Sequence, residues 1–443
     1  MFVSITRLCD RLVQRYLPDS FLFAIILTFV VFILGLSMTD SSPLNMVQYW
    51  GEGFWDLLDF TMQMALIVVT GYILANTPIV KTILARLALF AHTPGQAIVL
   101  VTVVASLACL INYGFGLVIG ALFARHVVRN VPTVDYRLLI ASAYSGFLVW
   151  HGGLSASIPL TIATPDHFLE NMLGTIPITD TLFSSYNIFI VVSFVISLPI
   201  INFLLLKATD QNNKIDPTFM ENTSDVKSEE AATTTTPTPA ERLENSTIVS
   251  MLLGGLGLGY VFYYFIQNGL DLNLNIVNFT FLFLGILFHR TPRRYLSVLG
   301  DAAKNAGGII IQFPFYAGIM GMMVASGLSE QISLWFVSIS TETTLPLFSF
   351  LSAGIINFFV PSGGGQWAVQ GPIMIPAAFE LGADPARIAM SVAWGDAWTN
   401  MIQPFWTLPL LAIAGLKVRD IMGFCLILLF WALIPISVGL IFM

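Results

Sequence analysis

The chain has 443 residues, of which 56% are hydrophobic and only 10% are charged, and its formal net charge is −7. Because soluble domains carry about 25% charged residues, this composition excludes a soluble protein and predicts an all-α polytopic membrane protein surrounded by lipid. The net charge says little more, since much of the acid sits in one hydrophilic segment. The three cysteines, Cys9, Cys109 and Cys425, lie far apart, so we expect no disulfide framework.

The first half contains three uninterrupted apolar runs, which predict membrane spans at 20–38, 60–76 and 187–206. The first run is too long for a signal peptide and has no cleavage site, so we expect it to be retained. An amphipathic segment with three arginines precedes it, at positions 7, 11 and 15. Residues 79–90 carry two basic side chains and predict an interfacial helix.

Two further apolar stretches of the first half are interrupted. Residues 95–128 are broken by the polar and glycine-containing run 112–116, and residues 136–163 are broken by His151-Gly152-Gly153. Residues 165–186 follow with acids but no lysine or arginine, and we expect them to form a loop. Residues 209–244 are strongly polar and bury too little apolar surface to fold, which predicts a flexible linker.

This linker divides the chain into a first transmembrane repeat, 1–208, and a second one, 245–443. Apolar runs in the second part predict spans at 247–266, 276–288, 305–327 and 421–442, with a short amphipathic helix at 329–340. Residues 388–414 are an interrupted span. Residues 351–378 are apolar but contain Pro361-Ser362-Gly363-Gly364-Gly365, and a single helix cannot continue through such a run.

The polar breaks predict re-entrant hairpins, because bare backbone at membrane depth survives only inside protein or a water-filled cavity. When the N-terminus is placed in the cytoplasm, only Arg387 of the 19 basic residues falls outside. This arrangement requires a hairpin at 95–128 that opens to the cytoplasmic side and one at 345–380 that opens to the outer side. The expected fold is therefore two hairpins of opposite polarity and two broken transmembrane helices.

The two halves also resemble each other in sequence order. Asn112 in LINYGFG aligns with Asn357 in IINFFVPSGGG, and Arg137 and Arg387 follow at similar spacings. SIPLTIA in the first half matches TLPLLAIA in the second. With opposite polarities, this order predicts an inverted-topology repeat, an arrangement typical of secondary transporters, although chance similarity between apolar segments is the competing interpretation.

The hairpin tips are the expected substrate site. Helix N-termini carry about half a positive charge and bind anions, and glycines let a ligand approach the backbone. No lysine or arginine lies at this depth, so the site suits a small monoanion. The candidate substrate-binding residues come from both tips and both broken spans: Asn112, Gly114, Gly116, His151, Gly152, Gly153, Asn357, Ser362, Gly363, Gly364, Gly365, Gln366, Trp394 and Trp398. Glycines that only permit close helix packing are the alternative.

The interrupted span around 394–400 is a candidate coupling-ion site. Asp396 is the only acid placed well inside a span, and a carboxylate there is costly enough that function is its default explanation. Together with Thr399, Asn400 and unwound carbonyls it could hold Na⁺, or it could carry a proton. A structural hydrogen bond to a helix end is the plainer alternative. His151 could titrate or donate to the ligand.

The sequence contains no Walker A motif, no HExxH, no nucleophile elbow and no metal-spaced cluster of Cys and His. We therefore expect no enzymatic activity, no cofactor beyond a coupling H⁺ or Na⁺, no metal site and no nucleic-acid partner. A channel is not favoured, because the sequence contains no repeated pore ring or pore helix.

The motifs VPSGGGQWAVQGP (Val360–Pro372) and AWGDAWTNMIQPFW (Ala393–Trp406) resemble the bacterial short-chain fatty acid transporter family, and this similarity spans essentially the whole chain. More distantly, the chain looks like the ion-transporter superfamily of sodium–dicarboxylate and citrate carriers, whose tips carry a Ser-Asn-Thr pattern. Here the tips read Asn112-Tyr113-Gly114 and Asn357-Phe358-Phe359 instead. This departure leaves open whether the sodium sites of those relatives exist in this chain.

The family resemblance implies uptake of butyrate- or acetoacetate-like monocarboxylates across the bacterial inner membrane, coupled to protons or sodium. The superfamily resemblance implies a homodimer with a scaffold and a moving transport domain. A dicarboxylate or other small-anion permease, or a sodium/proton exchanger, is the alternative function.

Overall fold

The computed structural model describes residues 20–207, 238–403 and 405–443, and within them the chain is helical and contains no strand. Eight of the described stretches are long and apolar enough to cross a membrane, which confirms the predicted all-α polytopic fold. Five of them are α2 (Ser20–Met38), α4 (Leu58–Ala75), α6 (Pro94–Ile111), α11 (Ser185–Leu206) and the broken stretch Tyr136–Ala163. The others are α14 (Thr247–Asn268), α17 (Gly307–Ala325) and α23 (Val418–Phe442).

Many helices begin where the sequence places a capping side chain before a proline. Proline fits the first helical position because its missing N–H would have no intrahelical partner there. Thr77, Thr93 and Thr291 each accept a hydrogen bond from the backbone two or three residues into the helix that they cap. The helices concerned are α5 (Pro78–Ala88), α6 and α16 (Pro292–Lys304).

Short amphipathic helices lie between the spans. The predicted interfacial helices are present as α5 and α18 (Leu328–Ile339). Two further ones, α3 (Pro43–Gly53) and α16, were not assigned from the sequence. Both segments are too short to span a membrane, and such segments form stable helices only by packing one face against a neighbouring span. In the structure α3 packs on α17, and α16 packs on α4.

The same series of elements occurs twice. The first is α4, α5, the pair α6 and α7 (Tyr113–Asn130), the broken stretch α8 (Tyr136–Ser145), η1 (Gly146–Gly152) and α9 (Ser157–Ala163), and then α11. The second is α17, α18, the pair α19 (Leu345–Ile356) and α20 (Gly363–Leu381), the broken stretch α21 (Pro385–Thr399) and α22 (Thr407–Ala414), and then α23.

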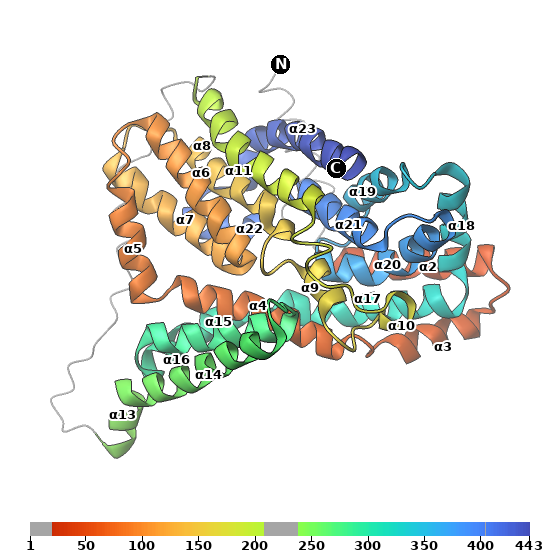
Figure 1. Cartoon of the computed structure of the whole chain (residues 1–443), viewed down its shortest axis with the longest axis horizontal. Helices are drawn as coiled ribbons and strands as arrows, with labels where there is room; N and C mark the ends of the chain where they lie inside the picture. The colour runs from red at the N-terminus through yellow and green to blue at the C-terminus, as the bar shows by residue number, and fades with distance from the viewer. Residues whose placement is uncertain (1–19, 208–237, 404) are drawn as a thin grey trace.

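Equivalent elements pack in equivalent ways, as the inverted repeat requires. Helix α7 contacts α4, α5 and α8, and α20 contacts the corresponding α17, α18 and α21. Helix α6 packs on α8 as α19 packs on α21, and the last helices of the two series, α11 and α23, pack on each other. The two broken stretches consequently lie side by side in the interior, as Figure 1 shows for α9 and α21.

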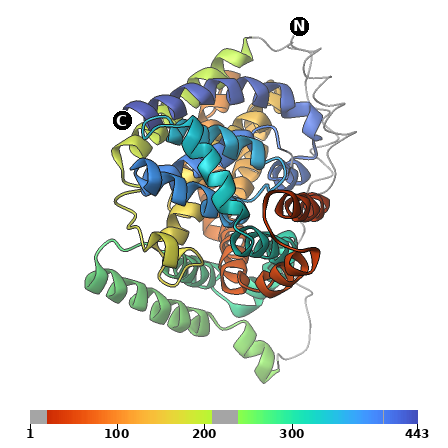
Figure 2. The same cartoon turned by 90° about the vertical axis from the view of Figure 1, so that its right-hand side faces the viewer.

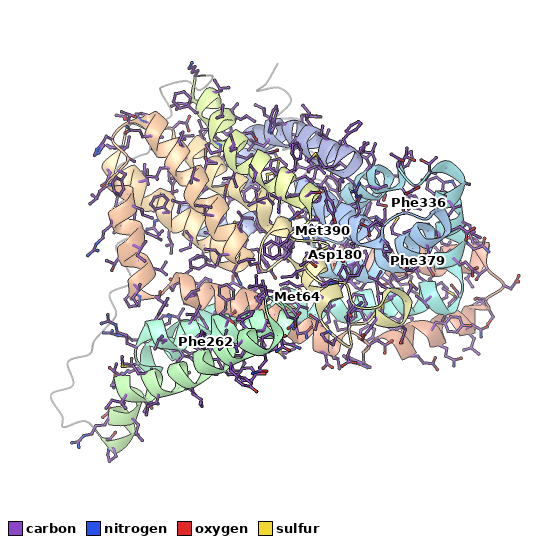
Figure 3. The ribbon with its side chains drawn as sticks, in the orientation of Figure 1. Met64, Asp180, Phe262, Phe336, Phe379 and Met390 are labelled. Carbon is purple, nitrogen blue, oxygen red and sulfur yellow. The ribbon has the colours of Figure 1, made fainter. Side chains whose placement is uncertain are left out.

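Helices α13 (Pro239–Glu244), α14, α15 (Leu274–His289) and α16 form an arm at one edge of the molecule (Figures 1 and 2). Gly254 and Gly257 of α14 let α15 approach closely. The outer face of the arm is apolar, and Phe262, labelled in Figure 3, is 70% exposed, as expected for a surface that meets lipid. Helix α13 occupies the end of the predicted linker, whose residues 209–237 lie outside the described residues, as do the N-terminal arginines.

Candidate functional site

The tip of the second hairpin carries three backbone amides without a protein partner. Helix α19 ends at Ile356 and α20 begins at Gly363, earlier than the expected start after Gly365. The first intrahelical bond runs from the amide of Gln366 to the carbonyl of Ser362, at 2.7 Å. Ser362 precedes the helix but its side chain does not cap it. No hydrogen bond within the described residues involves the amides of Gly363, Gly364 or Gly365.

Each of these glycines faces a different element. A methyl group added to Gly363 would clash with the Nε2 atom of His151 and with the Oγ atom of Ser157, at 2.6 Å. One on Gly364 would clash with Phe60 of α4, and one on Gly365 would lie 2.6 Å from the ring of Tyr316 in α17. The three glycines therefore place the start of α20 directly against the broken stretch of the first repeat and against α4 and α17.

The first hairpin tip is built differently. Helix α7 begins at Tyr113 rather than after Gly116 as expected, because Asn112 caps it. The Oδ1 atom of Asn112 accepts from the Phe115 amide at 2.8 Å, and the amide of Tyr113 donates to the Oγ atom of Ser155 at 2.9 Å. Side chains of the protein thus accept hydrogen bonds from backbone amides at this tip, whereas the backbone amides at the second tip have no such partners among the described residues.

The glycines of the first half serve close packing in the structure. A methyl group on Gly116 would meet the backbone of Cys109 across the hairpin, and one on Gly114 would lie 3.1 Å from the Cα atom of Val68 in α4. Gly153 is held as tightly against Leu110. Among the glycines of the candidate substrate site, those of α20 alone combine close packing with several unpartnered amides in the described residues.

Asp396 and His151 come from opposite halves of the chain and meet in the interior. Both side chains are fully buried, and the Nε2 atom of His151 lies 3.2 Å from the Oδ2 atom of Asp396. The side-chain Nδ2 atom of Asn400 donates to the same Oδ2 atom at 3.0 Å. The second atoms of the pair, Oδ1 of Asp396 and Nδ1 of His151, are buried and have no hydrogen-bond partner among the described residues.

The break in this stretch lies later than the sequence indicated. Helix α21 continues through Asp396 to Thr399, and the helix resumes at Thr407. The backbone at Asp396 is therefore helical, because its carbonyl accepts a hydrogen bond from the backbone amide of Asn400 at 3.1 Å. Gly395 and Trp398 form part of this regular helix because α19 packs against it, with Gly354 beneath the Trp398 ring.

Asn357 ties the second tip to this helix. Its Nδ2 atom lies 3.1 Å from the carbonyl oxygen of Asp396, 2.9 Å from Oγ1 of Thr399 and 2.9 Å from Oδ1 of Asn400. Three oxygens thus converge on one amide nitrogen, which can donate two hydrogen bonds. The Oδ1 atom of Asn357 is buried without a partner, as is Oε1 of Gln366 nearby on α20.

The two candidate tryptophans of α21 connect this helix to neighbouring helices. Trp394 donates to the Oδ1 atom of Asn187 in α11 at 3.1 Å and lies against Gly152. Trp398 donates to the carbonyl of Leu429 in α23 at 2.8 Å. Of the predicted substrate-binding residues, the structure brings together His151, Asn357, Ser362, Gln366 and the three glycines of α20. It places Asn112, Gly114 and Gly116 at the other tip.

Sequence reasoning missed four contributors to the site. Ser155 and Ser157 follow the predicted break at His151, and the Oγ atom of Ser157 is buried without a partner. Tyr144 donates to the carbonyl of Asn400 at 2.6 Å. The ring centroid of Tyr113 lies 4.8 Å from that of Trp150 and 5.7 Å from that of Trp406. These aromatic contacts connect the first tip to the residues beside His151. The alternation of two serines after a glycine pair was the available signal.

Two solved structures share this fold. The YdaH transporter of Alcanivorax borkumensis aligns with a TM-score of 0.59 over 96% of this chain and 98% of that chain. MtrF of Neisseria gonorrhoeae aligns with a TM-score of 0.50 over 98% and 97%. Sequence identity is 16% in both cases, so these comparisons establish the architecture alone.

Sequence comparisons are more specific. A relative from Escherichia coli (strain K12) is 47% identical over 440 residues and covers 99% of both chains. One from Haemophilus influenzae is 46% identical over 452 residues and covers 100% of both. Both carry the name "Putative short-chain fatty acid transporter". Residues 1–443 match the family described as "Short chain fatty acid transporter". The chain therefore belongs to the short-chain fatty acid transporter family.

Proposed function

We propose that this protein is a secondary active transporter that takes up butyrate- or acetoacetate-like monocarboxylates across the bacterial inner membrane, with H⁺ or Na⁺ as the coupling ion. The observation that carries the proposal is the set of bare amides at Gly363, Gly364 and Gly365, which begin a 19-residue buried helix. Amides and dipole at such a helix start attract one carboxylate. The neighbouring ring of Tyr316 and the indole of Trp150 offer apolar surface for a short acyl chain.

The difference between the two tips favours a monoanion over a dicarboxylate. A second carboxylate would need an equivalent set of donors, but at the first tip Asn112 and Ser155 already accept from the helix-start amides of Phe115 and Tyr113. The site is also closed, because Asn357, Gln366 and Asp396 have no exposed surface. Movement of the second hairpin relative to the first repeat would give the substrate access, as alternating access requires.

Uptake by purified protein in liposomes tests this function. Because the neutral form of a short-chain acid crosses lipid without a protein, each initial rate is compared with that of protein-free liposomes. We expect labelled butyrate and acetoacetate to enter faster through the protein and to exchange with unlabelled acid inside, whereas succinate and citrate do not. Accelerated entry of succinate without butyrate would replace this function with that of a dicarboxylate permease. Mass measurement in detergent checks the homodimer that the superfamily resemblance implies.

A further inference from the structure

The contact between His151 and Asp396 is a buried, titratable link between the two repeats. Both side chains are fully buried, 3.2 Å separates Nε2 from Oδ2, and each group retains one unpartnered atom, Nδ1 and Oδ1. The imidazole also lies against Gly363, at the first bare amide of α20. A base, an acid and a helix start with unpartnered amides therefore lie next to one another in the interior.

No other group around the pair changes charge near neutral pH. The titratable side chains nearest the pair on the packed elements are Tyr113 of α7, Tyr144 of α8, Cys109 of α6 and Cys425 of α23. Charged or titratable residues farther along the same helices include His126 of α7, Arg137 of α8 and Asp420 of α23. Phenols and thiols remain neutral at pH 7 in water. On α21 the other charged group is Arg387, nine residues and about 13 Å along the helix from Asp396. Helices α9 and α20 present hydroxyl and amide groups here, and α11 presents Asn187.

The oxygens that the sequence predicted for a sodium ion, apart from Oδ1 of Asp396, already have partners. The Asp396 carbonyl, Oγ1 of Thr399 and Oδ1 of Asn400 all lie within 3.1 Å of the Nδ2 atom of Asn357. A sodium ion at this place would have to displace that nitrogen. The Oδ2 atom of Asp396 is likewise taken by the Nδ2 atom of Asn400 and the imidazole. A proton, in contrast, needs one lone pair, and Oδ1 and Nδ1 each offer one.

We propose that the His151–Asp396 pair carries the coupling proton, one for each monocarboxylate bound at Gly363–Gly365. This inference rests on the proposed function and adds the identity and stoichiometry of the coupling ion. In this scheme the empty pair lacks the coupling proton and the loaded pair holds it. A second carboxylate beside it is repelled until a proton from water bonds to Nδ1 or Oδ1, so anion and proton bind together. On the inner side the anion leaves and the same proton returns to water.

The proposed stoichiometry predicts electroneutral transport. One anion and one proton move together, so the cycle transfers no net charge. In proteoliposomes we expect an inwardly directed pH gradient to raise the initial rate of acetoacetate uptake. A sodium gradient, or a potassium-diffusion potential imposed at equal pH, leaves that rate unchanged. Stimulation by sodium or by the potential alone overturns the proposal.

Two variants test whether the pair carries the coupling proton. In Asp396→Asn and His151→Gln we expect stimulation by the pH gradient to fall at least about tenfold, while exchange of labelled for unlabelled acetoacetate continues at a reduced rate and loses its dependence on pH. Asp396→Glu restores part of the stimulation. The matched controls Asp301→Asn and His92→Gln change exposed residues far from the site and keep the wild-type response.

The remaining outcomes are decisive as well. Undiminished gradient stimulation in both pair variants overturns the proposal, since the proton is then carried elsewhere. Loss of exchange along with gradient stimulation, in variants that remain monodisperse on gel filtration, assigns the pair to substrate binding and also overturns it. Absence of both uptake and exchange in the wild-type protein is a different result, because it refutes the transport function itself.

Discussion

Gly363 shows how one missing side chain permits a close contact between the two repeats. Its amide is unpartnered, and the space in which a Cβ atom would lie is already taken by His151 and Ser157. Neither neighbour can retreat easily, because both are buried and belong to the broken stretch of the first repeat. The glycine therefore lets the start of α20 approach the other repeat closely.

Gly363→Ala is expected to lower the initial rate of acetoacetate uptake by about tenfold or more, because the added methyl group forces α20 away from the imidazole and misplaces the amides by a few tenths of an ångström or more. Proteoliposome uptake measures the effect. Gly255→Ala is the matched control, since a methyl group there meets nothing within 4 Å, and it should leave the rate unchanged. Equal rates for the two variants would contradict a role for the close approach.

The two tip asparagines show what a residue type alone can predict. Their alignment predicted an asparagine at each tip, and each lies where a helix ends. Their hydrogen bonds differ, however. The Asn112 oxygen caps α7 and its nitrogen donates to the Ile67 carbonyl at 3.5 Å, whereas Asn357 uses only its nitrogen, as a donor to α21, among the described residues. An amide offers both atoms, and only the surrounding acceptors and donors decide which one is used, so the sequence could not distinguish them.

At the scale of elements, the first hairpin is a self-capped unit. Asn112→Ala removes the acceptor for the Phe115 amide and should lower the free energy of unfolding by about 1 kcal/mol. Thermal unfolding in detergent measures this change as a lower midpoint. Asn112→Ser keeps a capping oxygen and should retain most of the stability. If the serine variant is as unstable as the alanine variant, the cap is not what stabilises the tip.

The loop after α9 has its own pH response. The Nδ1 atom of His167 accepts from the Leu169 amide at 3.2 Å and Nε2 donates to the Gly174 carbonyl at 2.9 Å, an arrangement that requires a neutral ring. Burial lowers the pKa of His167, although the Gly174 hydrogen bond and Glu170 oppose that effect. As the pH falls below the ordinary histidine pKa near 6.5, His167 becomes protonated in the open loop but stays neutral in the closed loop. The closed loop therefore becomes less stable at lower pH.

Hydrogen exchange tests this response. Between pH 7.5 and 5.5, we expect the protection of residues 167–174, corrected for the intrinsic exchange rate, to decrease. His167→Gln should abolish that decrease, whereas His92→Gln, which changes an exposed histidine, should preserve it. Protection that rises toward acid pH would show that the charged ring, not the neutral one, closes the loop.

Apolar runs and glycine breaks predicted most elements, including both hairpins and both broken spans. The exact restarts were not predictable, because caps such as that of Asn112 act through side-chain geometry over two or three residues. The pairing of His151 with Asp396 was beyond reach as well. The two residues lie 245 positions apart, and no periodicity connects them. The amphipathic helices α3 and α16 depend on the spans against which they pack.

At the scale of the whole molecule, the distribution of basic residues predicts a cytoplasmic N-terminus and hence a side for every loop. Glu52 on α3 and Lys304 on α16 are both exposed and should lie on opposite sides of the membrane. In a Cys9→Ser background, Glu52→Cys should react with an impermeant maleimide in spheroplasts. Lys304→Cys should react only after permeabilisation, while Cys109 and Cys425 stay protected by burial. The reverse pattern would invert the proposed orientation.

The hydrogen bond between His151 and Asp396 has a consequence for how the molecule can move. One partner belongs to each repeat, so any rearrangement that slides one half past the other must lengthen or part this bond. In the proposed mechanism, the charge state of this pair therefore affects how strongly the bond opposes separation of the two repeats.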